Sequence, residues 1–198
     1  MVLFNAKKNI TMALIGKQAP SFSAEALLNG ESKTLSLSDF SNNYTVFFYY
    51  PKDDTGVCGS EVHAFHKRME EFTSRGVKVI GASVDTMDSH KQWASRSIGE
   101  GGIQGLNFPL VSDSGRTIAA DYDVIVGEWS RNADGTVNAP SDSITYRGLF
   151  IIDKEGKVRH ELHNDIPLGR SIDECLRNID AIKNLDENGE VCMVHSTK

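Results

Sequence analysis

Hydrophobic positions in the chain form short continuous runs that alternate with helically spaced sets. Continuous apolar runs at residues 45–50 and 77–85 have the length of strands that are buried on both faces. Between them, apolar residues recur at helical spacing over residues 62–72, and Gly76 follows where a helix would end. This alternation of strand and helix favours an α/β layered fold with a largely parallel central sheet.

The pattern continues beyond residue 85. Residues 87–97 predict a short helix, and residues 107–124 predict a strand end followed by another helix. Residues 147–163 hold two apolar runs around a turn that contains glycine, which predicts a hairpin. A last helix is predicted over residues 171–185, with Ser171 as its N-cap. The polar residues 126–146 read as a surface excursion.

Composition and charge narrow the class of protein. With 198 residues, of which 39% are hydrophobic and 24% charged, the chain is long enough for one packed globular domain. A net charge of −6 gives no field that would attract nucleic acid. No apolar run approaches the roughly 20 residues of a membrane span, and the first residues lack a signal-peptide pattern, so we expect a cytoplasmic protein. We expect an extension at 1–12, a main domain at 13–170, and a C-terminal helix and tail at 171–198.

The chain has three cysteines, Cys58, Cys175 and Cys192. They are too few and too far apart for a secreted disulfide framework, and none forms a C-x-x-C pair, which argues against structural zinc and against a thioredoxin-type reductase. Cys175 lies on the apolar stripe of the last predicted helix, which favours core packing over redox chemistry. We expect neither a metal nor a cofactor, and the H-x-x-H pair at His63 and His66 has no companion ligands nearby in the sequence.

Cys58 follows the strand predicted at 45–50 and lies in the first turn of the helix predicted after it. Partial positive charge and unpaired backbone N–H groups at a helix N-terminus favour the thiolate over the thiol. Thr55 can offer its hydroxyl to the sulfur or to a bound oxygen, and Pro51 can fix the loop. The alternative is a buried, unreactive thiol in the core, but Thr55 and Pro51 favour a nucleophile in a preorganised site.

The spacing Pro51, Thr55, Cys58, followed by Glu61, resembles the active-site motif of the peroxiredoxins, thiol peroxidases with a thioredoxin-like fold. Further segments fall in the order of that family over residues 14–192: "APSF", "FFYYP", "VIGASVD", "FPLVSD", "YRGLFIID" and "NGEVC". The resemblance implies an α/β thioredoxin-like fold, with a central mixed sheet flanked by helices and peroxiredoxin-type extensions.

The resemblance also implies roles for residues far from the motif. Cys192, in "GEVC", is similar to the resolving cysteine of the typical two-cysteine branch, the alkyl hydroperoxide reductase type, and Arg147 matches an arginine beside the reactive sulfur. Two departures stand out, because Gly59 and Met193 follow the two cysteines where that branch has proline. "PKDDTG" is instead similar to the bacterioferritin-comigratory branch, although residue 63, where many of its members place the resolving thiol, is histidine.

The implied function is reduction of hydrogen peroxide and organic hydroperoxides through a Cys58 sulfenic acid and an intersubunit disulfide with Cys192. The implied partners are a dithiol reductant, either thioredoxin or a flavoprotein, and a second copy of the chain, in a homodimer or a decameric ring of dimers. The alternative is a peroxide sensor or an oligomeric holdase chaperone on the same scaffold. Two further alternatives stay open: Arg147 as an exposed cation, and Glu61 as a charge that only favours the first helical turn.

Overall fold

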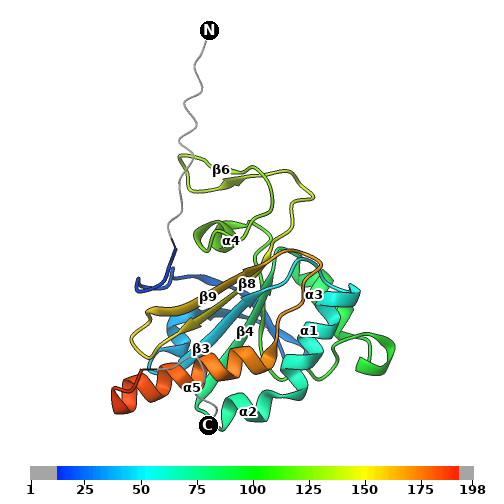
Figure 1. The fold of residues 1–198 in the computed structure, drawn as a ribbon. Coiled ribbons are helices and arrows are strands. Elements are labelled where there is room, and N and C mark those ends of the chain that lie inside the picture. The colour runs from blue at the N-terminus through cyan, green and yellow to red at the C-terminus, as the bar shows by residue number, and fades with distance from the viewer. Residues whose placement is uncertain (1–12, 192–198) are drawn as a thin grey trace.

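The computed structural model describes residues 13–191, which fold around one seven-stranded sheet (Figure 1). Its strands are β1 (Ser23–Leu28), β2 (Glu31–Ser36), β3 (Tyr44–Tyr49), β4 (Val77–Ser83), β5 (Leu110–Ser112), β8 (Arg147–Ile152) and β9 (Val158–Asn164). The spatial order is β2-β1-β5-β4-β3-β8-β9. The predicted α/β fold with a mixed sheet is confirmed.

The sheet is not largely parallel, so that part of the expectation from the hydrophobic pattern is wrong. Only β3 with β4 and β4 with β5 pair in parallel, and the other four pairings are antiparallel. The reason is that strand–helix alternation holds only for the middle of the chain. A hairpin, β1–β2, adds antiparallel strands at one edge, and the predicted hairpin, β8–β9, adds them at the other.

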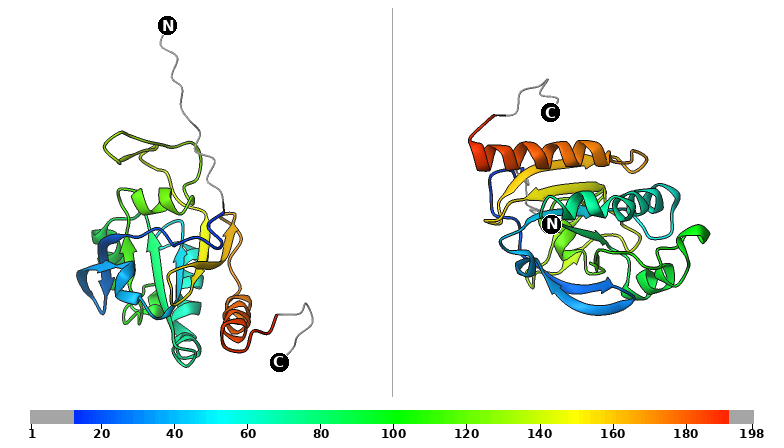
Figure 2. Two further views of the ribbon diagram at one scale, coloured as in Figure 1. Left: turned by 90° about the vertical axis from the view of Figure 1, so that its left-hand side faces the viewer. Right: turned by 90° about the horizontal axis from the view of Figure 1, so that it is seen from below.

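Helices cover both faces of the sheet (Figure 2). They are α1 (Gly56–Lys67), α2 (Met69–Thr73), α3 (Met87–Ala94), α4 (Thr117–Asp121) and α5 (Ile172–Asn188), with short 3-10 turns at Leu37–Phe40 and Ile98–Glu100. Apolar side chains of α1, α2 and α5 pack with Trp93 of α3 on one face, and those of α4 pack on the other. Among the described residues, no helix is long and apolar enough to cross a membrane.

Strand β3 lies at the centre of the fold, and each of its residues is buried. Side chains alternate between the two faces of a strand, and so Phe48 joins the core beneath α1 while Phe47 joins the core beneath α4. Phe48 stacks on Phe65 of α1 with ring centroids 4.3 Å apart. This contact fixes the helix that carries Cys58 against the strand that leads into it.

The helical pattern over residues 62–72 divides into two helices, because α1 ends at Lys67 and α2 begins at Met69. Gly76 then adopts a positive φ of 68° as the chain turns into β4. The last helix has the predicted N-cap, since the Ser171 hydroxyl accepts a hydrogen bond from the Glu174 N–H. It runs three residues beyond the predicted end, to Asn188.

The polar segment 126–146 is a surface excursion, as predicted, but it carries a small two-stranded sheet of β6 (Ser130–Arg131) and β7 (Val137–Asn138). Arg131 pairs with Asp121 of α4 at 2.6 Å. Trp129 is half-buried and packs against the core on the α4 face. The excursion therefore attaches to α4, on the opposite face of the sheet from α1 (Figure 1).

Candidate active site

Cys58 is the third residue of α1 and is almost fully buried. Thr55 is the N-cap, with extended backbone, and its carbonyl accepts the hydrogen bond of the Gly59 N–H at 2.7 Å. The backbone N–H groups before Gly59 therefore have no partner within the helix, and they lie at the end of the helix that carries partial positive charge. The prediction that Cys58 lies in the first turn is confirmed.

Arg147 is the first residue of β8, and only 2% of it is exposed, so the alternative of an exposed cation is wrong. Its Nη1 atom lies 3.5 Å from the sulfur of Cys58. Its Nε–H donates to the carbonyl of Ile166 at 2.7 Å, which fixes the plane of the guanidinium. Two ends of the guanidinium are thus held, one by the loop after β9 and one at the thiol.

Glu61, one turn after Cys58, bridges Arg147 and a second buried arginine, Arg170. One Glu61 oxygen accepts from Arg147 Nη1 at 2.5 Å and from Arg170 Nη2 at 3.0 Å. The other accepts from the backbone N–H and Nε–H of Arg170, each at 2.8 Å. Of the two open interpretations, the hydrogen-bonding role fits this geometry, because the side chain reaches past the helix end to both guanidiniums.

The sequence analysis missed Arg170. It stands just before α5 in a loop whose sequence carries no motif, and only the packing of that loop brings it to Glu61. Its Nη1 also donates to the carbonyls of Tyr49 and Gly148, at 2.8 and 2.6 Å. Burial lowers the pKa of Arg170, while the charge of Glu61 opposes that shift.

The charges around the sulfur do not cancel while Cys58 is a thiol. Arg147 and Arg170 carry two positive charges and Glu61 one negative charge, all in the protein interior. Charges in a low-dielectric interior interact strongly, so this net charge of one attracts negative charge to the site, and one further anionic charge would make the group neutral. The helix N-terminus acts in the same direction.

Thr55 and Pro51 border the same turn. The Thr55 hydroxyl donates to the carbonyl of Lys52 at 3.1 Å, so in this structure it bonds to its own loop rather than to the sulfur. Pro51 is buried where β3 ends. Five of the six predicted site residues therefore lie in or around this turn, and the sixth, Cys192, lies outside the described residues.

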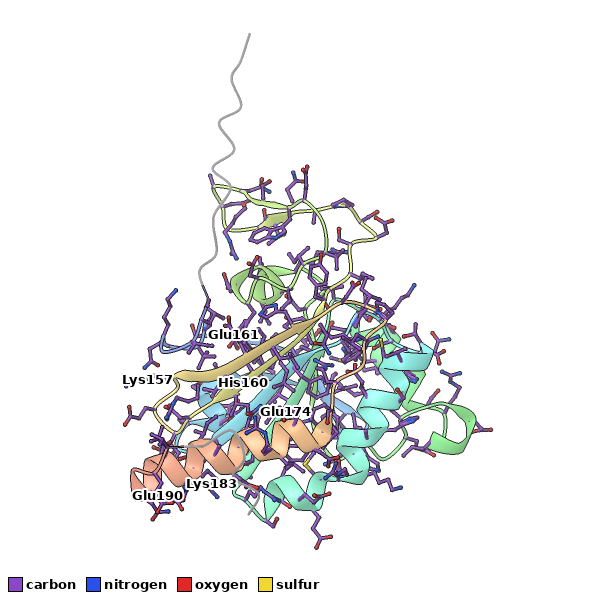
Figure 3. The ribbon with its side chains drawn as sticks, viewed as in Figure 1. Lys157, His160, Glu161, Glu174, Lys183 and Glu190 are labelled. Carbon is purple, nitrogen blue, oxygen red and sulfur yellow. The ribbon has the colours of Figure 1, made fainter. Side chains whose placement is uncertain are left out.

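The second described cysteine, Cys175, is buried in α5 and lines a pocket between α5 and β9 together with His160 and Glu174. Figure 3 labels His160 on β9 and Glu174 on α5. Burial raises the pKa of Cys175 to about 12, so its thiol stays protonated at neutral pH. The prediction that Cys175 packs in the core is confirmed by its place in the main cluster.

In the described part of the chain, no group of three or more His, Cys, Asp or Glu side chains could hold a metal ion. The buried Nδ1 atom of His66 has no hydrogen-bond partner among the described residues, and the His63 ring faces a backbone carbonyl. The Nε2 atom of His63 lies 2.8 Å from the carbonyl of Gly102.

A buried cysteine at a helix N-terminus, flanked by an arginine and set on a mixed sheet, defines a thiol-based catalyst of the thioredoxin-like class. Residues 15–161 match the AhpC/TSA family. The chain belongs to this family and is a typical two-cysteine peroxiredoxin.

Named relatives extend over almost the whole chain. It is 42% identical to a thioredoxin peroxidase of Echinococcus granulosus, over 91% of this chain and 86% of that protein. It is 43% identical to peroxiredoxin-2 of Macaca fascicularis, over 91% and 84%. The crystal structure of reduced 2-Cys peroxiredoxin from Plasmodium vivax superposes with a TM-score of 0.82 at 34% identity, covering 93% of this chain and 89% of that one. A mitochondrial 2-Cys peroxiredoxin from Plasmodium falciparum gives 0.76 at 37%, covering 91% and 100%.

Proposed function

We propose that Cys58 is the peroxidatic nucleophile of this thiol-dependent peroxidase. The observation that carries the proposal is the 3.5 Å contact between Arg147 Nη1 and the Cys58 sulfur, inside a buried group that has one surplus positive charge. The thiolate attacks the terminal oxygen of a hydroperoxide, the O–O bond breaks, and the OH group passes to sulfur as a sulfenic acid. The leaving hydroxide or alkoxide takes a proton from water.

Arg147 and Thr55 serve this step in different ways. The guanidinium stands where negative charge develops on the departing oxygen and stabilises it. The Thr55 hydroxyl, at the N-cap, turns from the Lys52 carbonyl to a bound peroxide oxygen. Pro51 shapes the loop, and Glu61 with Arg170 holds Arg147 in place.

Cys192 is the second thiol of the proposed cycle. Its thiol condenses with the sulfenic acid of a partner subunit, forming a disulfide and releasing water. A dithiol reductant of the thioredoxin type then restores both thiols by exchange. The name of the Echinococcus granulosus relative supports thioredoxin over a flavoprotein. We infer a homodimer, which can assemble further into rings, and a cytoplasmic location, where thiols are kept reduced.

Three single variants test the proposal. Cys58→Ser should lose peroxide consumption with thioredoxin and its reductase, and Cys175→Ser should keep it. Cys192→Ser should consume about one equivalent of peroxide and stop as a sulfenic acid, because attack remains and resolution is lost. Peroxide turnover by Cys58→Ser at the wild-type rate would refute the assignment.

A non-reducing denaturing gel tests the dimer. Oxidised wild-type protein should run as a covalent dimer, and the Cys58→Ser and Cys192→Ser variants should not. Monomeric migration with both thiols oxidised would place the disulfide within one chain. Cell fractionation checks the location.

A further inference from the structure

A buried polar cluster lies beside the loop that leads into α1, on the side of helix α3. His90, in α3, is fully buried. Its Nδ1 atom lies 2.8 Å from a carboxylate oxygen of Asp53, and its Nε2 atom lies 3.3 Å from the carbonyl oxygen of Val111. Both partners are acceptors, so each ring nitrogen must carry a proton to make both hydrogen bonds. The geometry therefore describes an imidazolium.

Asp53 connects this ring to the catalytic turn. It stands two residues before the N-cap Thr55. Its backbone N–H donates to Asp85 at 2.9 Å, and its carboxylate accepts from the Tyr50 hydroxyl at 2.8 Å and from the Ser89 hydroxyl at 2.7 Å. The backbone and the side chain of Asp53 are thus both fixed.

The same helix also contacts the turn after the thiol. Trp93 lies one helical turn after His90, and a Cβ atom on Gly59 would be 3.8 Å from its ring. The Trp93 Nε1–H donates to the carbonyl of Gly101 at 2.9 Å, which fixes the ring. Residues of α3 therefore border the chain on both sides of Cys58, at Asp53 before it and at Gly59 after it.

We propose that His90 is a positioning residue for the peroxidase: as a buried imidazolium it holds Asp53, and through Asp53 the loop that places Thr55 and Cys58. The proposal rests on the proposed role of Cys58. A neutral imidazole has one N–H and can donate to only one of its two acceptors. Deprotonation of His90 therefore releases either the Asp53 carboxylate or the β5 carbonyl.

The surroundings of His90 give the sign of the pH dependence. The charged groups facing it are Asp53 from the loop before α1 and Asp85 from the loop before α3, while β5 presents a neutral carbonyl. Tyr50 faces Asp53 as a neutral phenol, because burial raises its pKa. Burial opposes protonation of His90, but the hydrogen bond and charge of Asp53 outweigh it and raise its pKa. Its contribution is complete at pH below about 6.5 and is lost as pH rises through the raised pKa.

The first test observes the ring directly. Nitrogen-15 NMR of the reduced wild-type protein, with His90→Asn for assignment, should show both His90 nitrogens protonated at pH 7. This ring should lose its proton at a pH above the value of about 6.5 at which an unperturbed histidine titrates. A His90 nitrogen without a proton at pH 7 would overturn the proposal. This measurement needs no activity, so it stands even where the assignment of Cys58 fails.

The second test uses kinetics. Stopped-flow reaction of the reduced enzyme with hydrogen peroxide, over about pH 5–10, should show a decline on the alkaline side in the wild type. In His90→Asn, whose amide can still donate to Asp53 but does not titrate, that decline should vanish, and the rate at pH 7 should fall by about tenfold or more. An unchanged alkaline decline in His90→Asn would refute the proposal.

The chain offers a matched control within the same loop. Asp54 is next to Asp53 but exposed, and it pairs with Arg96 at the surface. It has a positive φ of 54°, which asparagine tolerates. Asp53→Asn should lower the peroxide rate and alter its pH profile as His90→Asn does, whereas Asp54→Asn should match the wild type. Equal effects of the two would overturn the proposal.

Discussion

Replacing Glu61 by Gln would remove a carboxylate that accepts four hydrogen bonds from two buried arginines. The amide keeps one acceptor oxygen and turns an NH₂ donor toward guanidinium donors. Breaking a buried ion pair from one side costs about 3–5 kcal/mol, because the remaining charge stays buried without its partner. For a chain of this length each kcal/mol lowers the unfolding midpoint by roughly 2–4 °C. The expected fall is therefore roughly 6–20 °C.

Thermal and urea unfolding of the reduced protein would measure this cost. Glu71→Gln is a matched control, because Glu71 pairs with Arg68 at the surface, and its unfolding midpoint should stay that of the wild type. Adding Arg170→Met to Glu61→Gln should recover part of the loss, since one stranded cation is removed. An unfolding midpoint for Glu61→Gln within measurement error of Glu71→Gln would refute the reasoning that this cluster is held by its carboxylate.

Substitutions at two glycines and at one helix N-cap give further predictions. Gly59→Ala should raise the free energy of unfolding by about 0.5–1 kcal/mol, because alanine favours the helix and its Cβ would meet Trp93 at an ordinary 3.8 Å. The same change should slow disulfide formation. Urea unfolding measures the first effect and stopped-flow fluorescence the second, and a loss of stability would contradict the prediction. Gly102→Ala should lose about 2 kcal/mol or more, since its Cβ would lie 2.1 Å from the Arg96 carbonyl; wild-type urea stability would contradict it. Ser171→Ala should lose about 1 kcal/mol with the N-cap of α5, and Ser171→Asn should not.

The sequence predicted the parts of the fold that follow from local pattern. The buried runs became β3 and β4, and the glycine-containing turn became the β8–β9 hairpin. The β1–β2 hairpin was missed, although Asn29 and Gly30 both have positive φ, as the type I′ turn of a two-residue hairpin requires. The signal was present there as an Asn-Gly pair, but the run after it, Glu31–Ser36, is mostly polar and does not have the pattern of a strand.

The residues of the site also divide into those that a local pattern identifies and those that it does not. Cys58, Thr55 and Pro51 lie within eight residues of one another, so a local motif could identify them. Arg170 contacts Glu61 across 109 positions, and such a contact depends on how the loop before α5 packs. No spacing rule within one sequence reports a pair so distant. The division of residues 62–72 into two helices was missed because the apolar spacing continues across the break.

The surplus positive charge beside Cys58 also bears on damage by excess peroxide. A sulfenic acid is neutral, so in the proposed cycle the first oxidation leaves the surplus positive charge of Arg147 and Arg170 without a balancing anion at the sulfur. A sulfinate, the product of a second oxidation, restores a negative charge at the same place. The surplus positive charge of this cluster would therefore also accommodate the dead-end product. Electrostatics offers the enzyme no protection against inactivation, and its survival in high peroxide depends on how fast the second thiol arrives.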